Sequence, residues 1–210
     1  MEETVVVARE DAVPGKFFPS LEVSERAYIP ETARSNSRFK NASKIDDATI
    51  ERIALQYERM AERAGIVPTD LRFHVGQGNA VVWQPYQTND YLVGQFIGDV
   101  FAVSHFAPET QRSGVLALQD LLYSATPAVF AVPEKLASQL SRIGFKESRV
   151  IVPMMFHGEV QKKHVLVNNI FNEQHLQHLL SWYSIEVRKS GLTASLTAES
   201  RMLPSAEAAV

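Results

Sequence analysis

Three side chains capable of proton transfer lie at or just beyond the end of one apolar run, residues 100–106. They are Ser104, His105 and Glu109, and each is a residue type that enzymes use as a general base or a nucleophile. If residues 100–106 form a strand, Ser104 and His105 point to opposite faces of the sheet, and Glu109 follows the strand's end. The spacing identifies no partner for any of the three, so a structural role for His105 stays open beside a catalytic one.

A second set of chemically active side chains consists of His175 and His178, which lie three residues apart in a predicted helix. Two histidines at this spacing could share a metal ion, but zinc sites use three or four protein ligands. No third ligand stands at a matching spacing, and the chain contains no cysteine. The sequence therefore predicts no metal site.

The candidate acid–base residues belong to a stretch, residues 90–145, in which strand and helix patterns alternate. Residues 91–96 and 100–106 are apolar runs rich in β-branched and aromatic residues, and Gly98 between them favours a tight hairpin turn. Helical spacing of apolar residues begins at Val115, and Gly144 is placed to end a second helix. The pattern predicts a β-β-α-β-α unit with strands at 91–96, 100–106 and 128–132 and helices at 115–125 and 133–143.

The turn that follows residue 106 carries the most specific motif of the chain. In the GNAT superfamily of acyl-CoA N-acyltransferases, a strand ends in Val-x-Pro and is followed by Gln/Arg-x-x-Gly-x-Gly/Ala. The chain has Phe106, Pro108, Gln111 and Gly114 at four of these places and Leu116 at the last one. With the order of the predicted elements, this turn resembles the GNAT superfamily, and it is most similar to the short members that bacteriophages encode. The resemblance begins at residue 4 or 39 and extends to residue 156.

The resemblance implies an α/β (mixed α+β) fold: a central, mostly antiparallel sheet of six or seven strands flanked by helices, with a C-terminal helix and tail. It also implies that the thioester of acetyl-CoA or another acyl-CoA lies where the strand at 100–106 diverges from the strand at 128–132. Backbone N–H groups at a helix N-terminus attract anions, and the family binds the coenzyme pyrophosphate there. The implied coenzyme-binding residues are Phe106, Gln111, Arg112, Ser113, Gly114, Val115 and Leu116.

Three positions depart from the family pattern. Leu116 places a bulky side chain where a small residue lets the backbone approach the pyrophosphate. Leu140 stands where the family often has a tyrosine that protonates the leaving thiolate, and Pro133 stands where it often has asparagine. Two functions therefore stay open. The chain is either an N-acyltransferase that acts on an unidentified amine, or a catalytically inactive GNAT-like binding or structural module, for example a component of a phage particle or of its assembly.

The chain ahead of residue 90 is predicted to add one long helix and three strands. The helix covers residues 50–64 and ends at Gly65, because its apolar residues recur at i, i+3, i+4 and i+7, and Ser43 with Asp46 resembles a capping box. Residues 33–44 are polar and basic, and a solvated loop ahead of a helix is favoured over a patch for phosphate or nucleic acid. The strands are predicted at 4–8, 71–75 and 80–83, the last two joined by a turn at 76–79.

The C-terminal part of the chain predicts two strands and a helix. The strands lie at 149–156 and 164–167, and Pro153 indicates that the first of them is an edge strand or a bulged strand. Residues 172–189 return to helical spacing, with Leu176, Leu179, Leu180 and Tyr183 on one face. We therefore expect a GNAT-like domain over residues 1–170 and a helix with a tail over residues 171–210, through which the chain self-associates or meets an assembly partner.

Composition excludes several classes of protein. The chain has 210 residues, 45% of them hydrophobic, which suffices for one sizeable core. Its net charge of −3 does not favour nucleic acid or acidic membranes as partners. No apolar stretch approaches the ~18 residues of a membrane span, and the first residues do not resemble a signal peptide. The absence of cysteine excludes disulfides and a cysteine nucleophile. We expect a cytoplasmic protein, or one of the host cytoplasm or virion if a phage encodes it.

Overall fold

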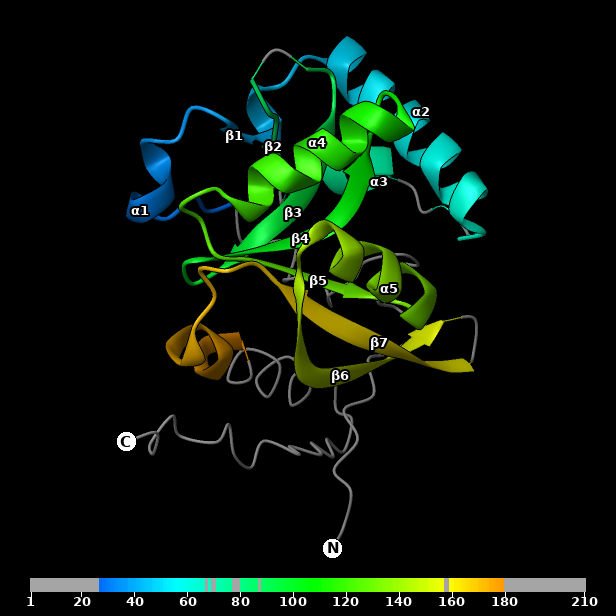
Figure 1. Ribbon diagram of the computed structural model, residues 1–210. Helices are drawn as coiled ribbons and strands as arrows, with labels where there is room; N and C mark the ends of the chain where they lie inside the picture. Colours follow the sequence, from blue (N-terminus) through cyan, green and yellow to red (C-terminus); the bar gives the residue numbers. More distant parts are fainter. Residues whose placement is uncertain are drawn as a thin grey trace, which may run out of the picture.

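The computed structural model describes residues 27–66, 68, 71–76, 80–86, 88–156 and 159–179. Its centre is a seven-stranded sheet with the strand order β1-β2-β3-β4-β5-β7-β6 (Figure 1). Neighbouring strands are antiparallel except β4 and β5, which run parallel. The mixed α/β fold with a mostly antiparallel sheet is therefore confirmed. The strands are β1 (Phe39–Asn41), β2 (Val81–Trp83), β3 (Tyr91–Ile97), β4 (Val100–Ala107), β5 (Ala128–Val132), β6 (Lys146–Phe156) and β7 (Glu159–Val167).

Helices cover both faces of this sheet. Tyr57 of α2 and Leu71 of α3 share a buried apolar cluster with Val93 of β3. On the other face, Leu121 of α4 packs in a cluster with Phe101 of β4. The prediction that residues 50–64 and 115–125 pack on a sheet with residues 100–106 at its centre is confirmed. The helices are α1 (Glu31–Arg34), α2 (Asp47–Ala64), α3 (Leu71–Gly76), α4 (Gln111–Leu122) and α5 (Glu134–Ile143), with a 3-10 turn at Ala42–Lys44.

The predicted β-β-α-β-α unit corresponds to β3, β4, α4, β5 and α5. The β3–β4 hairpin turns at Gly98, whose φ of 57° lies in the left-handed region that favours glycine. Helix α5 ends at Gly144, whose φ is 122°. Helix α4 begins four residues earlier than Val115, because the Thr110 side chain accepts a hydrogen bond from the Ser113 N–H and caps the helix there.

One predicted strand is wrong. Residues 71–76 form the helix α3 instead of a strand that pairs with residues 80–83. Leu71 and Val75 stand four residues apart and are both buried against α2, so the same residues satisfy helical spacing. Arg72 of α3 also forms ion pairs with Glu51 and Glu58 of α2, at 2.7 Å and 2.6 Å. Packing on α2 decides the helical conformation of this segment.

Two expectations about the region ahead of α2 also need correction. Residues 33–44, predicted as a loop, include the end of α1, the strand β1 and a 3-10 turn. The N-cap of α2 is Asp46, whose carboxylate accepts from the Thr49 N–H, and the side chain of Asn41 accepts from the Ser43 N–H. Ser43 therefore does not cap α2. Asp46 is followed by Thr49 at the N3 position, which allows the cap without a capping box.

The C-terminal part of the described chain forms an edge of the sheet and a short helix that packs on it. Strand β6 lies at the edge of the sheet, which is the first of the two alternatives predicted from Pro153. Residues 173–179 are helical, and Leu179 is fully buried beside Ile97, Val100 and Val167 of the chain's own sheet. The predicted strand at 4–8 and the predicted helical residues Leu180 and Tyr183 lie outside the described residues. In the part of the chain that the structure describes, no helix is long and apolar enough to cross a membrane.

Candidate functional site

The parallel strands β4 and β5 pair over only part of their length. The register joins Phe101 to Ala128, Ala102 to Val129 and Val103 to Phe130, and no pair follows although β4 continues to Ala107. The paired end is held by Asn168, which accepts from the Ala128 N–H at 3.2 Å and donates to the Thr126 carbonyl at 2.8 Å. The sheet therefore opens between β4 and β5 beyond Val103, as the resemblance to the GNAT superfamily implies.

Ser104 is the first residue of β4 beyond the last pair with β5, and it is also the site of a β-bulge. The β3–β4 register shifts between Val93 and Gly94, so that Val93 faces His105 and Gly94 faces Val103. The bulge interrupts the alternation of side chains, and the Ser104 Oγ lies 2.7 Å from the His105 Nδ1. The expectation that these side chains point to opposite faces is wrong, because it assumed a regular strand.

The Ser104–His105 pair is held from two sides. The Ser104 Oγ donates to the Val93 carbonyl oxygen at 3.0 Å and is partly buried. The His105 ring is fully buried and contacts the ring of Tyr57 on α2 edge to face, with centroids 4.8 Å apart. This environment can support two roles for His105, as a packed core residue and as a proton acceptor that works through the Ser104 hydroxyl.

Glu109, the third candidate, is separated from this pair. It is exposed, and its Oε1 accepts from Asn89 Nδ2 at 3.3 Å. Its backbone N–H donates to Asp90 Oδ1 at 2.9 Å. The structure thus brings Ser104 and His105 together and places Glu109 in the turn between β4 and α4.

This β4–α4 turn is closed by a capping box. The Thr110 N–H donates to the Ser113 Oγ, and the Ser113 N–H donates to the Thr110 Oγ1, both at 3.1 Å. The Gly114 N–H donates to the Thr110 carbonyl oxygen at 2.9 Å as the first helical bond. Only the N–H groups of Gln111 and Arg112 in this first turn have no acceptor among the described residues. Most donors that an anion would use are therefore engaged within the chain.

A buried carboxylate lies under the same turn. Asp90, the residue before β3, is fully buried, and its Oδ1 accepts from the Glu109 N–H and from the Ser113 Oγ at 2.8 Å. The Asp90 Oδ2 is also buried and has no hydrogen-bond partner in the part of the chain that the structure describes. A helix N-terminus stabilises negative charge, and here the chain supplies that charge itself. Sequence analysis missed Asp90, because nothing local links a residue before β3 to a helix that begins at residue 111.

The family-pattern residues of the turn have structural roles here. A Cβ on Gly114 would lie 2.6 Å from the Pro108 Cβ and 2.9 Å from the Phe106 Cζ, so glycine is required for packing α4 onto β4. Leu116 is 57% exposed and Val115 is 37% exposed, and Arg112 is exposed beside them. Leu116 thus occupies the surface where a close approach to the backbone was expected.

The two positions expected to act on a leaving thiolate are structural as well. Leu140 is buried in the apolar cluster under α5, and Pro133 is the N-cap of that helix. Neither side chain can transfer a proton. Among the described residues, no group of three or more His, Cys, Asp or Glu is placed to hold a metal ion.

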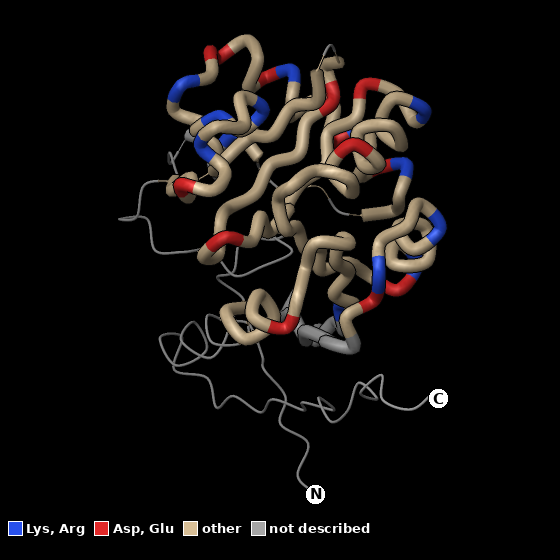
Figure 2. Tube along the Cα trace, turned by 60° about the vertical axis from the view of Figure 1, so that its left-hand side comes forward, with Lys and Arg blue, Asp and Glu red and all other residues tan. Residues whose placement is uncertain are grey.

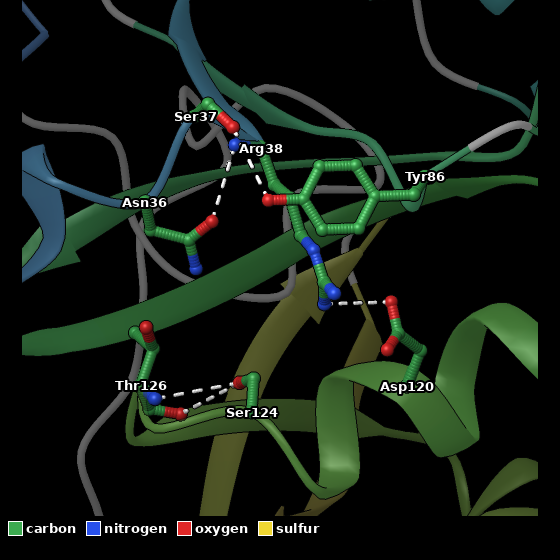
Figure 3. A network of polar contacts seen from close by, with 7 residues as sticks. All are labelled: Asn36, Ser37, Arg38, Tyr86, Asp120, Ser124 and Thr126. Carbon is green, nitrogen blue, oxygen red and sulfur yellow. Dashed lines mark hydrogen bonds and ion pairs between the residues drawn. The ribbon is translucent and has the colours of Figure 1, made fainter.

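Two of the basic residues ahead of α2, Arg34 and Arg38, form ion pairs within the chain. Arg38 forms an ion pair with Asp120 of α4 at 2.7 Å and lies over the ring of Tyr86, 4.2 Å from its centroid (Figure 3). The hydrogen bond with Ser37, and then contact with Arg38, lowers the pKa of the Tyr86 phenol. Acidic and basic residues are interspersed on the helices and turns, whereas the strands at the centre are mostly uncharged (Figure 2). The ion pair between Arg38 and Asp120 therefore links the start of β1 to α4.

Comparison with known proteins adds little to this description. No protein-family model and no curated protein sequence matches the chain. A solved structure of a GCN5-related N-acetyltransferase from Rhodopseudomonas palustris, described as "Aminotransferase, Class-II", is similar over 68% of this chain and 92% of that chain, with 12% identity and a TM-score of 0.31. At this TM-score the likeness carries no argument. The fold is GNAT-like on its own features: the mostly antiparallel sheet, the opening between β4 and β5, and the helix that directly follows β4.

Two parts of an acyl-CoA molecule fit these residues differently. Beyond Val103 the side of β4 that no longer pairs with β5 suits an extended chain with amide groups, such as the pantetheine arm. The first turn of α4 does not suit the pyrophosphate, because Asp90, Thr110 and Ser113 already satisfy its donors and its charge preference.

Proposed function

We propose that this protein binds a pantetheine thioester, such as acetyl-CoA or another acyl-CoA, between β4 and β5 and transfers its acyl group to an amine. One observation carries the proposal: β4 continues for four residues after its pairing with β5 stops at Val103. An extended ligand with amide groups can form backbone hydrogen bonds with the side of β4 that has left β5, as a peptide does at a sheet edge.

The proposed transfer needs a proton acceptor but no covalent enzyme intermediate. The amine nitrogen forms a bond to the thioester carbon, the carbon–sulfur bond breaks, the nitrogen loses a proton and the sulfur leaves as a thiol. Ser104 lies where the strands diverge, with His105 directly behind it at 2.7 Å. We assign the removal of the amine proton to this pair: the Ser104 oxygen takes the proton of the amine as the Ser104 hydroxyl gives its own proton, turned from the Val93 carbonyl oxygen, to the His105 Nδ1.

Thiol release from acetyl-CoA in the presence of candidate amines tests the proposal. The chain contains no cysteine, so a thiol reagent reports the released coenzyme alone. Ser104→Ala should lower kcat about 100-fold, the usual contribution of acid–base catalysis. Ser138→Ala is the matched control, because Ser138 is exposed on α5 and its hydroxyl donates to the Glu134 carbonyl. An unchanged rate in Ser104→Ala would contradict the assigned role of Ser104.

A second candidate function, a GNAT-like binding or structural module without transferase activity, is favoured by the positions of Leu140 and Pro133. One is buried core and the other is a helix cap, so neither can protonate a thiolate. The module could serve in a phage particle, in its assembly or on a host protein. A ligand that binds only the folded state raises the melting temperature. No shift with millimolar acetyl-CoA or S-acetylpantetheine would favour this second function.

We also propose that the region from Leu176 onward mediates self-association, on the pattern of its apolar residues. Leu179 already packs on the chain's own sheet, whereas Leu176 is only partly buried. Light scattering of the full-length protein should give the mass of a dimer or larger particle, and Leu176→Glu should lower it. A monomer mass for the unsubstituted chain at micromolar concentration would refute this proposal. Truncation after Asn169 is less informative, because it would also expose the face that Leu179 covers.

A further inference from the structure

We propose that Asp90 is a built-in anion that occupies the first turn of α4 and keeps the coenzyme pyrophosphate away from it. The thioester donor is then recognised through its pantetheine arm, with its phosphate groups left in solvent. The inference rests on the proposed function, since it concerns the donor that the β4–β5 opening receives. It assigns to Asp90 a role in donor selection, without contact with the reacting atoms.

The hydrogen bonds of the turn carry the first part of the argument. Of the backbone N–H groups between Glu109 and Gly114, those of Glu109, Thr110, Ser113 and Gly114 are bonded within the chain. A bound pyrophosphate could use only the N–H groups of Gln111 and Arg112 without breaking an existing bond. Each hydrogen bond that had to be exchanged would reduce the net gain from binding the anion.

The charge of Asp90 carries the second part. Its Oδ1 lies one hydrogen bond from the Glu109 N–H, at 2.9 Å, and the whole side chain is shielded from water. Because like charges repel, the Asp90 carboxylate disfavours a second anion at this turn. The favourable effect of the helix N-terminus is already used by the carboxylate. The Asp90 Oδ2 is buried as well, and it has no hydrogen-bond partner among the described residues.

The surface of the turn carries the third part. Leu116 is 57% exposed on the first two turns of α4, where a phosphate would need a small residue and a close backbone. Arg112 is the sole basic residue of α4. A single exposed cation beside an apolar side chain and a buried carboxylate does not make a pyrophosphate site. All three observations agree in leaving the pantetheine arm as the part that the protein binds.

Calorimetry with two ligands tests the inference without requiring activity. S-acetylpantetheine carries the thioester and the arm but no phosphate, whereas acetyl-CoA carries both. For the unsubstituted protein, the two dissociation constants should agree within about threefold, since the pyrophosphate contributes little. Asp90→Asn keeps an oxygen that can accept from Glu109 and Ser113 but removes the charge. It should tighten acetyl-CoA binding about tenfold and leave S-acetylpantetheine binding unchanged.

Asp99→Asn is the matched control. Asp99 lies in the β3–β4 hairpin, at the opposite end of β4, and its Oδ1 accepts from the Thr32 hydroxyl at 3.2 Å. This variant removes the same charge and keeps an acceptor, so neither affinity should change. If both variants tighten acetyl-CoA equally, the effect is one of overall charge and the inference is overturned.

The ratio of the two affinities in the unsubstituted protein decides the matter even if Asp90→Asn does not fold. Acetyl-CoA bound tenfold or more tightly than S-acetylpantetheine would overturn the inference about Asp90 and leave the proposed function intact. Binding of neither ligand would overturn both. Equal binding of the two ligands supports the inference.

Discussion

A carboxylate accepts hydrogen bonds at the N-terminus of both α2 and α4. In α2 it belongs to the residue next to the helix, whereas in α4 it belongs to a residue distant in the chain. Asp46 is the residue directly before α2, and it accepts from the Thr49 N–H and the Thr49 hydroxyl at 2.8 Å and 2.9 Å. At α4 the N-cap is Thr110, and the carboxylate is Asp90, which arrives from the start of β3 and is fully buried. The first arrangement is local, and the second joins a helix to a strand.

This difference has consequences for what each helix N-terminus can do. The Asp46 cap stabilises α2 at the surface, and the two hydrogen bonds that its carboxylate accepts both come from Thr49 of the same helix. The Asp90 carboxylate holds the turn after β4 in place, because it binds both the Glu109 N–H and the Ser113 hydroxyl. The same carboxylate occupies the place that an external anion would take at the N-terminus of α4. The turn between β4 and α4 is thereby a structural joint.

Removing the buried carboxylate should have the largest effect on stability. Asp90→Ala leaves the Glu109 N–H and the Ser113 hydroxyl without their acceptor and opens a small cavity. We expect a loss of roughly 2–4 kcal/mol in the free energy of unfolding, measured by urea denaturation. Asp90→Asn should recover most of the loss, since its oxygen can replace Oδ1. If Asp90→Ala lowers the free energy of unfolding no more than the removal of an exposed aspartate does, Asp90 does not hold the turn after β4.

The packing of α4 on β4 is the next most sensitive feature. Gly114→Ala places a Cβ within 2.6 Å of the Pro108 Cβ and 2.9 Å of the Phe106 ring. The helix or the turn must shift, and we expect a loss of about 2 kcal/mol in the same denaturation experiment. Ala117→Gly on the same helix should cost about 1 kcal/mol through helix propensity and more through the loss of a buried methyl group, because Ala117 is buried. If Gly114→Ala is neutral or stabilising, close packing at this corner is not required.

The polar cap of α4 should contribute less than its buried joint. Thr110→Ala removes the acceptor of the Ser113 N–H but leaves the bonds of Asp90 in place. A loss of about 1 kcal/mol is expected, measured by urea denaturation beside Asp90→Ala. If Thr110→Ala destabilises more than Asp90→Ala, the local cap rather than the tertiary contact holds the turn, and the contrast between the two helices disappears.

The surface cap of α2 should have the smallest effect, and its effect should depend on pH. Hydrogen bonds from Thr49 lower the pKa of Asp46 below its ordinary value of 3.8. A depressed folded-state pKa means that the ionised carboxylate stabilises the fold above pH 3.8 and that this contribution is lost as pH falls below it. Asp46→Asn should therefore lower the melting temperature by a few degrees at pH 7.

The same comparison at low pH tests the sign. Near pH 3 the difference in melting temperature between the unsubstituted protein and Asp46→Asn should shrink. A difference that grows on acidification would contradict an ionised cap. The variant Asp47→Asn, one residue later and also exposed, controls for the general loss of a negative charge near the start of α2.

Much of the fold follows from local signals in the sequence. The β3–β4 hairpin, the strand β5, the helix α5 and the end of α2 at Gly65 were predictable, because hydrophobic period and glycine placement act over a few residues. The segment at 71–76 was not, since its alternating and helical spacings coincide at Leu71 and Val75. Contact with α2 chooses between them.

The candidate site divides in the same way. The turn after β4, its Gly114 and the side chains of Ser104 and His105 were visible in the sequence as separate features. Only the tertiary structure decides that a bulge brings Ser104 onto His105, that β4 leaves β5 after Val103, and that Asp90 lies under α4. Strand register and the burial of a charge depend on contacts between residues that are distant in the chain. Local sequence patterns do not reveal such contacts.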